Sequence, residues 1–433
     1  MSPQSAGAGS AGTGLGSLRV RPVDEEAAPL AVGDGAAGRD GLRAGVRRLK
    51  ALLDRPLASY YLVLGCALLL LGVGLMMVLS TSTAYDLENR LPPYSMFEKQ
   101  LLGAAVGLLL MLLAAKSPPR LFRAFAYPLL LASVGGLMLV LLFGHEVYGA
   151  KRWIGVAGTQ VQPSEFAKLA LVVWGADLLA RKEKLKQLAD WRHILVPLLP
   201  GAALMCMLVM IGKDLGTTFL LSVIFLALLW VVGAPAKLII GMVALMLFAL
   251  LMLVAVHPYE WARISSFLSS HSPSCRSLTC YQLVQGKDAL GSGGLFGVGS
   301  GASRGKWGWV PNSPTDSIFA ILGEELGLVG TLCVVVLYGG LAFAGFRIAR
   351  RVQDTFARLC AGAITVWLTA QALVNMGAVL GLLPITGVPL PLISAGVSSL
   401  IATMVAIGIL MSVARSEPGA AQALAGSVAG RGR

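Results

Sequence analysis

The stretch LASYYLVLGCALLLLGVGLMMVLS, residues 57–80, contains no charged residue along its whole length. A helix needs about 20 predominantly apolar residues to cross the hydrocarbon core of a bilayer, and this stretch is long enough. It is also too long for the apolar region of a secretory signal, which spans about 7–15 residues. We therefore predict that it forms the first membrane-spanning helix.

Similar stretches recur through the chain. The 433 residues are 56% hydrophobic and 13% charged, with a mean hydropathy of +0.75, whereas soluble domains carry about 25% charged residues. This composition predicts an all-α integral membrane protein with about ten transmembrane helices. The ten apolar stretches are 57–80, 98–115, 121–143, 163–181, 194–211, 214–233, 236–256, 317–346, 359–382 and 389–413.

The ends of the chain differ from this membrane domain, which we place at residues 56–414. Residues 1–55 are rich in Gly, Ala, Ser and Arg, as in disordered segments, and 415–433 reads as a second flexible tail. Short loops dense in Lys and Arg follow every second span, which places them and both termini in the cytoplasm. The net charge of +13 is therefore interpreted as a topology signal and not as nucleic-acid binding.

One large loop, residues 257–316, then lies outside the membrane between the seventh and eighth spans. Loops of this length are usually functional or disordered, and the density of motifs here favours function. The loop contains Cys275 and Cys280. A disulfide between them is plausible outside the cytoplasm, and their staying reduced is an equally open alternative.

The first motif is KRWIGVAGTQVQPSEFAK, residues 151–168. Pro163 suits the first position of a helix, and Glu165 and Lys168 then share one helix face. Ionisable residues inside a membrane segment are candidates for function, although a purely structural ion bridge is as good an explanation. Arg152 suits a phosphate contact at the membrane interface.

The second motif is GKDLGT, residues 212–217, a tight turn between two spans on the outer side. Asp214 lies where the next helix starts, and a carboxylate is stabilised there by the helix dipole. Capping is the simpler interpretation, with a role in the site as the alternative.

The third motif is the glycine run GSGGLFGVGSG, residues 291–301. It predicts a flexible or tightly turned backbone that leads to Arg304 and Lys306. These two cations could hold a diphosphate or an anionic lipid headgroup.

The fourth motif is KWGWVPNSPTDSIFAILGEELG, residues 306–327. Its segment 313–316 fits a helix capping box with Asp316 at the third helical position. Glu324 and Glu325 follow inside the apolar run. Because neighbouring helical residues point about 100° apart, at least one of these two acids must face other helices.

The fifth motif, NMGAVLGLLPITGVPLPLISAGVSS, residues 375–399, contains several prolines and glycines at the outer end of the last two spans. Irregular backbone at membrane depth persists only where protein or a water-filled cavity surrounds it. We expect a cavity-lining segment with Ser394 and Ser398 as candidate site residues, and an ordinary Pro-rich turn remains the alternative.

Together these five motifs resemble the SEDS family (shape, elongation, division and sporulation), and the resemblance covers about Leu57 to Val413. It implies polymerisation of the lipid-linked disaccharide-peptide lipid II into peptidoglycan strands outside the cytoplasmic membrane. It also implies a class B penicillin-binding transpeptidase as partner, together with other division proteins. By resemblance Asp316 is the catalytic residue, while Glu165, Lys168, Glu324 and Glu325 match the family's other ionisable positions.

The chain departs from the family pattern at Asn312, Ser317 and Ala395. The Pro311-Asn312 variant and the segment WGADLLARK, residues 174–182, resemble actinobacterial division members. The basic tail and the KRWIG and WGADLL segments favour enrichment at the septum over an elongation-type polymerase. A lipid II flippase is a second hypothesis, weakened by the lack of an inverted repeat. A third hypothesis is a membrane scaffold that recruits the transpeptidase and has no activity of its own.

The implied chemistry has requirements that these residues can meet. Transfer of a sugar from a lipid diphosphate needs a base for the acceptor hydroxyl, which Asp316 can supply. It also needs positive charge for the departing diphosphate, from Arg152, Lys168, Lys306 or a bound Mg²⁺ or Mn²⁺. The predicted substrate-binding residues are Arg152, Glu165, Lys168, Lys306, Glu324 and Glu325.

Overall fold

The computed structural model describes residues 57–147, 150–156, 159–185, 191–256 and 278–420. The predicted tail at 1–55 and residues 421–433 lie outside the described residues. Cys280 is buried and disulfide-bonded, whereas Cys275 also lies outside the described residues, so their pairing with each other stays a prediction.

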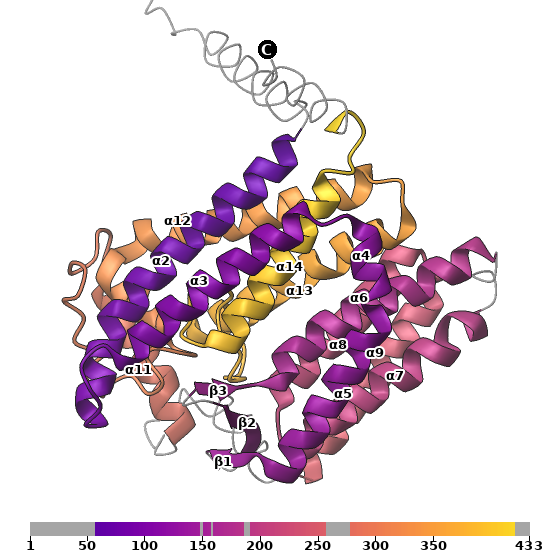
Figure 1. Cartoon of the computed structure of the whole chain (residues 1–433). Helices are drawn as coiled ribbons and strands as arrows, with labels where there is room; N and C mark the ends of the chain where they lie inside the picture. The colour runs from indigo at the N-terminus through magenta and orange to yellow at the C-terminus, as the bar shows by residue number, and fades with distance from the viewer. Residues whose placement is uncertain (1–56, 148–149, 157–158, 186–190, 257–277, 421–433) are drawn as a thin grey trace, which may run out of the picture. The chain divides into compact units, whose positions relative to one another are not determined.

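Ten long helices occupy the ten apolar ranges predicted from the sequence (Figure 1). They are α2 (Ala58–Glu88), α3 (Ser95–Lys116), α5 (Ala126–Phe143), α6 (Pro163–Lys184), α7 (Trp191–Ile211), α8 (Leu215–Val232), α9 (Ala236–Val256), α12 (Ile318–Arg351), α13 (Thr355–Val379) and α14 (Val397–Ala414).

Eight of these helices are long and apolar enough to cross a membrane, within the part of the chain that the structure describes. The exceptions are α6, which carries Glu165, Lys168 and Asp177, and α9, whose apolar part Ala236–Ala249 is shorter. The class of helical, multi-pass membrane protein is therefore confirmed. The count of ten spans and their orientation stay predictions.

Two short helices and a small sheet complete the described structure. The helices are α4 (Pro119–Ala124) and α11 (Leu278–Ser292), the latter inside the predicted large loop. The antiparallel sheet has the order β1 (His145–Val147), β2 (Ala150–Val156) and β3 (Thr159–Val161). It pairs Ile154 with Val161, residue types that favour strands. The structure thus adds a sheet that the purely helical expectation lacked.

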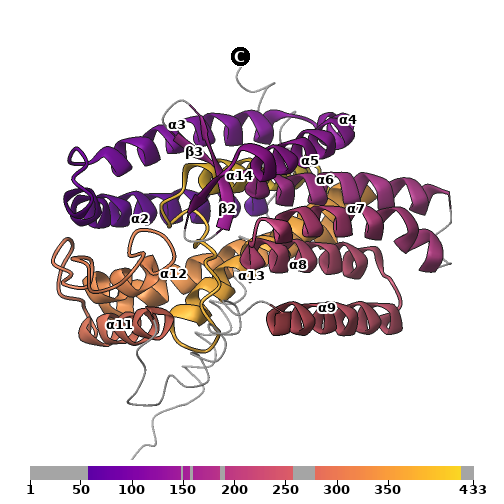
Figure 2. The same ribbon diagram turned by 90° about the horizontal axis from the view of Figure 1, so that it is seen from below.

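The helices α13 and α14 form the centre of the bundle, as the view from below shows (Figure 2). In each of them 78% of the most apolar window is buried, against 22% in α5 and 28% in α3. Small residues bring α3 and α14 close together: a Cβ atom at Gly408 would lie 2.5 Å from the carbonyl oxygen of Met111. Such small-residue contacts drive helix association in membranes.

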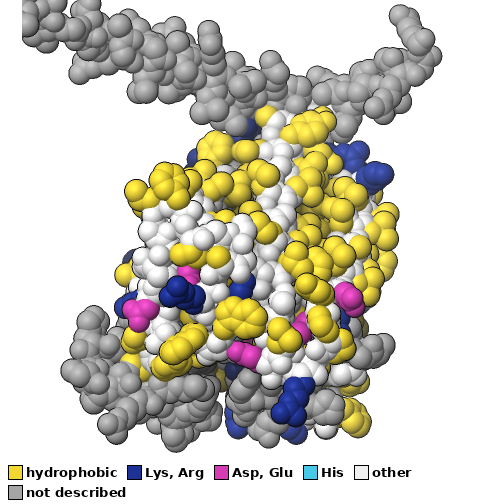
Figure 3. Space-filling model, turned by 90° about the vertical axis from the view of Figure 1, so that its left-hand side faces the viewer, with side chains coloured by type: hydrophobic (Ala, Val, Ile, Leu, Met, Phe, Trp, Pro, Cys, Tyr) yellow, Lys and Arg dark blue, Asp and Glu magenta, His cyan; other side chains and the backbone are white. Residues whose placement is uncertain are grey.

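The ends of several helices meet on one side of the bundle, which we call the site end. The helices α6, α8, α12 and α14 begin there and α13 ends there, as the contacts between their end residues show. The sheet and α11 lie at the same end (Figure 1). Figure 3 shows that hydrophobic side chains dominate the upper half of one face, whereas the visible acidic side chains lie in its lower half.

Helix α12 is broken near its start, at Gly327 with φ 67° and ψ −166°. The glycine run, now seen to be tightly folded, packs on this break and satisfies its backbone. The backbone amides of Val298 and Gly299 donate to the carbonyl oxygens of residues 324 and 325 at 2.9 and 3.1 Å. In return, the backbone amides of residues 328 and 329 donate to the carbonyl oxygens of residues 294 and 295. Helix breaks at membrane depth persist only with such replacement partners.

Candidate active site

Asp316 lies just before helix α12, not inside it. The helix begins at Ile318 and its N-cap residue, Ser317, makes no capping hydrogen bond, so the predicted capping box is wrong. The reason is tertiary: the carbonyl oxygen of Pro314 accepts a hydrogen bond from the amide of Ala395 at 2.9 Å, and that of Thr315 accepts one from Ser394 Oγ at 2.7 Å. These contacts hold residues 314–315 in a turn.

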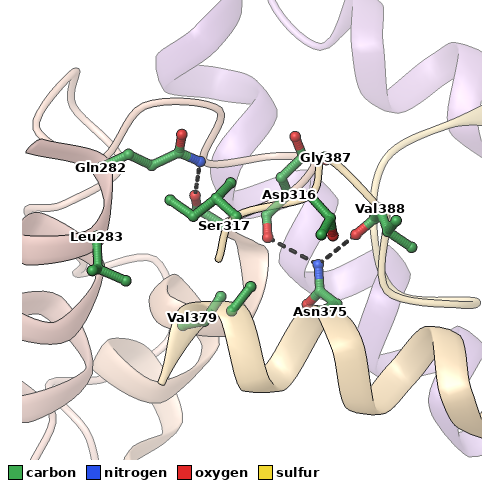
Figure 4. Close-up of a pocket in the computed structure, with 12 residues that line it drawn as sticks. Gln282, Leu283, Asp316, Ser317, Asn375, Val379, Gly387 and Val388 are labelled. Atoms are coloured by element: carbon green, nitrogen blue, oxygen red, sulfur yellow. Dashed lines mark hydrogen bonds between the residues drawn. The ribbon is translucent and has the colours of Figure 1, made fainter. Parts of the chain in front are cut away.

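A pocket at the site end contains Asp316 in its lining (Figure 4). It holds about 340 Å³ of empty space, part of it open to solvent. Asp316 is partly exposed, and the walls come from α11, the start of α12, the end of α13 and the segment 385–388. The lining residues are Gln282, Leu283, Gly286, Asp316, Ser317, Asn375, Ala378, Val379, Ile385, Thr386, Gly387 and Val388.

Asn375 positions the backbone of the candidate base. Its Nδ2 atom donates to the carbonyl oxygen of Asp316 at 2.9 Å and to that of Val388 at 2.8 Å, as Figure 4 shows. Because the amide group bridges two walls of the pocket, it ties Asp316 to the segment that follows α13.

The three departures from the family pattern are accommodated by this geometry. Ser317 Oγ donates to the carbonyl oxygen of Pro311 at 3.0 Å and accepts from Gln282 Nε2 at 2.9 Å. Asn312 has φ 54°, a left-handed conformation in which Asn is enriched. Ala395 contributes through its backbone amide, a contact that any residue except proline can make.

The predicted residue Ser394 holds the turn before α12. Besides donating to Thr315, its Oγ accepts from the amide of Leu390 at 2.7 Å. The structure therefore places it in support of the Asp316 segment, outside the pocket lining.

Three other predicted residues, Arg152, Asp214 and Ser398, meet around Gln162. Asp214 caps α8 by accepting from the amide of Thr217 at 3.1 Å, as its position predicted. It also accepts from Gln162 Nε2 at 3.1 Å and lies 3.8 Å from an Arg152 guanidinium nitrogen. Ser398 Oγ accepts a hydrogen bond from the backbone N–H of Gln162 at 3.1 Å.

Glu165 and Lys168 form the predicted pair, with Lys168 Nζ 3.0 and 2.9 Å from the two carboxylate oxygens. They are only 1% and 0% exposed. Lys168 Nζ also contacts Gln371 Oε1 at 3.0 Å, and Gln371 Nε2 donates to the carbonyl oxygen of Pro389 at 2.9 Å. The pair thus supports the segment behind the pocket, and its contact with substrate stays a prediction.

Glu324 and Glu325 are also buried, at 4% and 1% exposure. Glu324 accepts from Ser303 Oγ at 2.5 Å and from the amide of Arg304 at 2.9 Å. Glu325 lies 3.4 Å from Lys306 Nζ, so the two acids fix opposite parts of the 303–306 loop. None of these residues belongs to the described pocket lining, and their contact with substrate stays a prediction.

Residue-by-residue reading of the sequence missed Gln282 and Thr386, and named Asn375 only as the start of a motif. Asn375 Oδ1 and Thr386 Oγ1 are buried and have no hydrogen-bond partner in the described part of the chain. Buried polar atoms are nearly always hydrogen-bonded, and these two belong to residues that line the pocket. Only the fold brings α11 and the segment after α13 together.

A metal site made by the protein alone has no support in the described ranges. They contain no group of three or more His, Cys, Asp or Glu side chains that could hold an ion. A divalent cation in this pocket would need the substrate's own oxygens as additional ligands.

Comparison with known proteins places this geometry in a family. The family model FTSW_RODA_SPOVE, described as "Cell cycle protein", matches residues 60–418. The probable peptidoglycan glycosyltransferase FtsW of Mycobacterium tuberculosis is 39% identical over 379 residues, 87% of this chain and 72% of that protein. Stage V sporulation protein E of Bacillus subtilis is 35% identical over 352 residues, 80% and 94% of the two chains.

Two solved structures of similar fold support the same family. One, described as "Structural coordination of polymerization and crosslinking by a peptidoglycan synthase complex", shares 28% identity with a TM-score of 0.67, covering 82% of this chain and 98% of that one. The Rod shape determining protein RodA of Thermus thermophilus shares 27% identity with a TM-score of 0.59, covering 84% and 98%. The chain therefore belongs to the FtsW, RodA and SpoVE family of cell cycle proteins, the SEDS family.

Proposed function

We propose that this chain is a peptidoglycan glycosyltransferase that polymerises lipid II into glycan strands, with Asp316 as general base. Its relatives include proteins named as peptidoglycan glycosyltransferases. The observation that carries the proposal is the position of Asp316, partly exposed in the lining of the pocket at the site end.

The proposed reaction needs one proton transfer and one displacement. The Asp316 carboxylate takes the proton of the acceptor sugar's hydroxyl while that oxygen attacks the anomeric carbon of the donor sugar. The bond between this carbon and the diphosphate oxygen breaks, and the lipid diphosphate leaves with the electron pair. Attack opposite to the leaving group inverts the configuration at this carbon.

The lining of the pocket suits a neutral saccharide. Its described residues include neutral hydrogen-bonding side chains and apolar ones, with Asp316 as the ionisable side chain and no Lys or Arg. The unpartnered oxygens of Asn375 and Thr386 can accept hydrogen bonds from sugar hydroxyl or acetamido groups. A site built to satisfy such groups rejects ligands that lack them.

The same relatives support the proposed partner and location. One structural neighbour is a peptidoglycan synthase complex for polymerisation and crosslinking, which supports a class B penicillin-binding transpeptidase as partner here. The curated relatives named FtsW support a role with other division proteins at the septum. A fluorescent fusion that follows the side wall instead of the septum would contradict this location.

A divalent cation remains part of the proposal. Mg²⁺ or Mn²⁺ bound to the substrate diphosphate would neutralise negative charge on the leaving group. Synthesis measured in chelator and again after each metal is restored tests this requirement.

Reconstitution separates the candidate functions. The purified full-length chain, alone and with its transpeptidase partner, is incubated with lipid II, and the product is analysed by gel electrophoresis. A glycosyltransferase makes glycan strands, and the Asp316→Asn variant makes almost none. A flippase would instead change the accessibility of lipid II in liposomes without making polymer, and a scaffold would do neither.

A further inference from the structure

The pocket raises the question of where the diphosphate of the substrate binds. A lipid diphosphate carries negative charge that increases as it leaves, and cations placed near it stabilise the transition state. The described lining of the pocket contains Asp316 but no Lys or Arg. A cation must therefore come from the edge of the pocket or from elsewhere.

Three of the four cations predicted from the sequence are already paired, whereas the fourth, Arg304, is exposed and lies outside the described pocket lining. Lys168 is fully buried against Glu165, and Lys306 lies against Glu325. Arg152 donates to the carbonyl oxygen of Lys213 at 2.6 Å and lies beside Asp214. Each would have to give up or share an internal contact to bind a diphosphate.

Lys287 differs from these three residues. It lies on α11 directly after the lining residue Gly286 and one helical turn after Leu283. It is partly exposed, and within the described ranges no ion pair or hydrogen bond of its side chain is found.

The end of the Lys287 side chain lies against Gly381, which follows α13. A Cβ atom at Gly381 would overlap Cε and Nζ of Lys287. Gly381 has φ 72°, and it stands between the lining residues Val379 and Ile385. The ammonium group is thus at the edge of the pocket, between α11 and the turn after α13.

We propose that Lys287 binds the diphosphate of the lipid-linked sugar whose saccharide occupies the Asp316 pocket. This inference rests on the proposed function. It divides the site into a neutral part for the sugar and a cationic edge for the diphosphate. The ammonium group contributes charge-assisted hydrogen bonds to the diphosphate oxygens.

A purely structural role for Lys287 is the competing explanation. A cation near the C-terminal end of a helix is stabilised by the helix dipole, and α13 ends beside Lys287. If that were its whole role, neutralising Lys287 would lower the stability of the protein and leave the affinity for diphosphate unchanged.

The experiment compares Lys287→Met with Lys287→Arg in the full-length protein. Lys99→Met, at an exposed position on α3 outside the lining, is the matched control for the loss of one charge. Equilibrium binding of undecaprenyl diphosphate and undecaprenyl monophosphate is measured in nanodiscs, together with the KM for lipid II and the unfolding temperature.

We expect Lys287→Met to weaken binding of undecaprenyl diphosphate by about tenfold or more, as for loss of a hydrogen bond to a charged group. The KM for lipid II should rise in parallel, binding of the monophosphate should change less, and the unfolding temperature should stay the same. Lys287→Arg and Lys99→Met should remain within about threefold of the parent protein.

Unchanged diphosphate affinity in Lys287→Met would overturn the inference, as would an equal loss in Lys99→Met. A lower unfolding temperature with unchanged affinity would assign Lys287 to the helix end instead. Because binding is measured without turnover, the outcome is independent of synthesis. If the parent protein makes no glycan strands, the proposed function fails by a different observation.

Discussion

Two groups of carboxylates at the site end have opposite environments. Glu165, Glu324 and Glu325 are almost completely buried, and each accepts contacts from cations, hydroxyl groups or backbone amides. Asp316 is partly exposed in the lining of a pocket. A carboxylate that is held by internal donors stabilises the fold, whereas one that a ligand can reach is available for proton transfer.

The largest effect that this comparison predicts is on activity. Asp316→Asn should lower the rate of glycan synthesis by about 10²- to 10⁴-fold, the range for a general base, because the amide cannot take the proton. The unfolding temperature should change little, because Asn has nearly the same size and shape as Asp and the hydrogen bond from Asn375 goes to the backbone of residue 316. Strand synthesis from lipid II and thermal unfolding in detergent are the two measurements, and undiminished synthesis would remove Asp316 from the mechanism.

The second effect should appear in stability. Lys168→Met leaves Glu165 buried without its cation, and breaking such a pair costs about 3–5 kcal/mol. The double variant Glu165→Gln with Lys168→Met removes both charges and should recover much of this loss. Thermal unfolding monitored by size-exclusion chromatography compares the three proteins. If Lys168→Met were as stable as the parent but bound lipid II poorly, the pair would belong with Asp316 and not with the structural carboxylates.

A smaller loss of stability is expected where the glycine run packs on the break in α12. Gly297 has φ 81°, and a Cβ atom there would overlap the carbonyl oxygen of Glu325. Gly297→Ala should therefore cost about 1–3 kcal/mol from the strained backbone. Gly301 also has a positive φ, but a Cβ atom there would meet open space. Gly301→Ala therefore measures the cost of backbone strain alone, and the difference from Gly297→Ala measures the cost of the clash. Equal stabilities of the two variants would show that the clash is relieved.

The smallest effect sharpens the description of the pocket. Thr386→Val removes a buried hydroxyl that has no partner among the described residues, so stability should be unchanged or slightly higher. If this hydroxyl binds the sugar, the KM for lipid II should rise about three- to tenfold, as for loss of a neutral hydrogen bond. Thr386→Ser keeps the hydroxyl and should retain the parent KM. A KM that is unchanged in Thr386→Val would place the sugar elsewhere.

Hydropathy along the chain was enough to predict the membrane class and the position of the helices. A membrane span such as 57–80 can be predicted without knowing which helices pack beside it, because hydropathy and length decide whether a segment can span a bilayer. Three local signals were also correct: Pro163 begins α6, Asp214 caps α8, and Lys168 pairs with Glu165. The motifs also identified Asp316 as the candidate base before its surroundings were known.

Which of these residues support the fold and which line the site depends on contacts between distant segments. The capping box failed because residues 394 and 395, about 80 positions along the chain, take the carbonyl groups that a helix would have used. Gln282, Asn375, Thr386 and Lys287 come from segments whose meeting depends on how α11 packs beside the end of α13. Hydrogen bonds between distant segments leave no periodic signal in a single sequence, so the walls of the pocket became visible only in three dimensions.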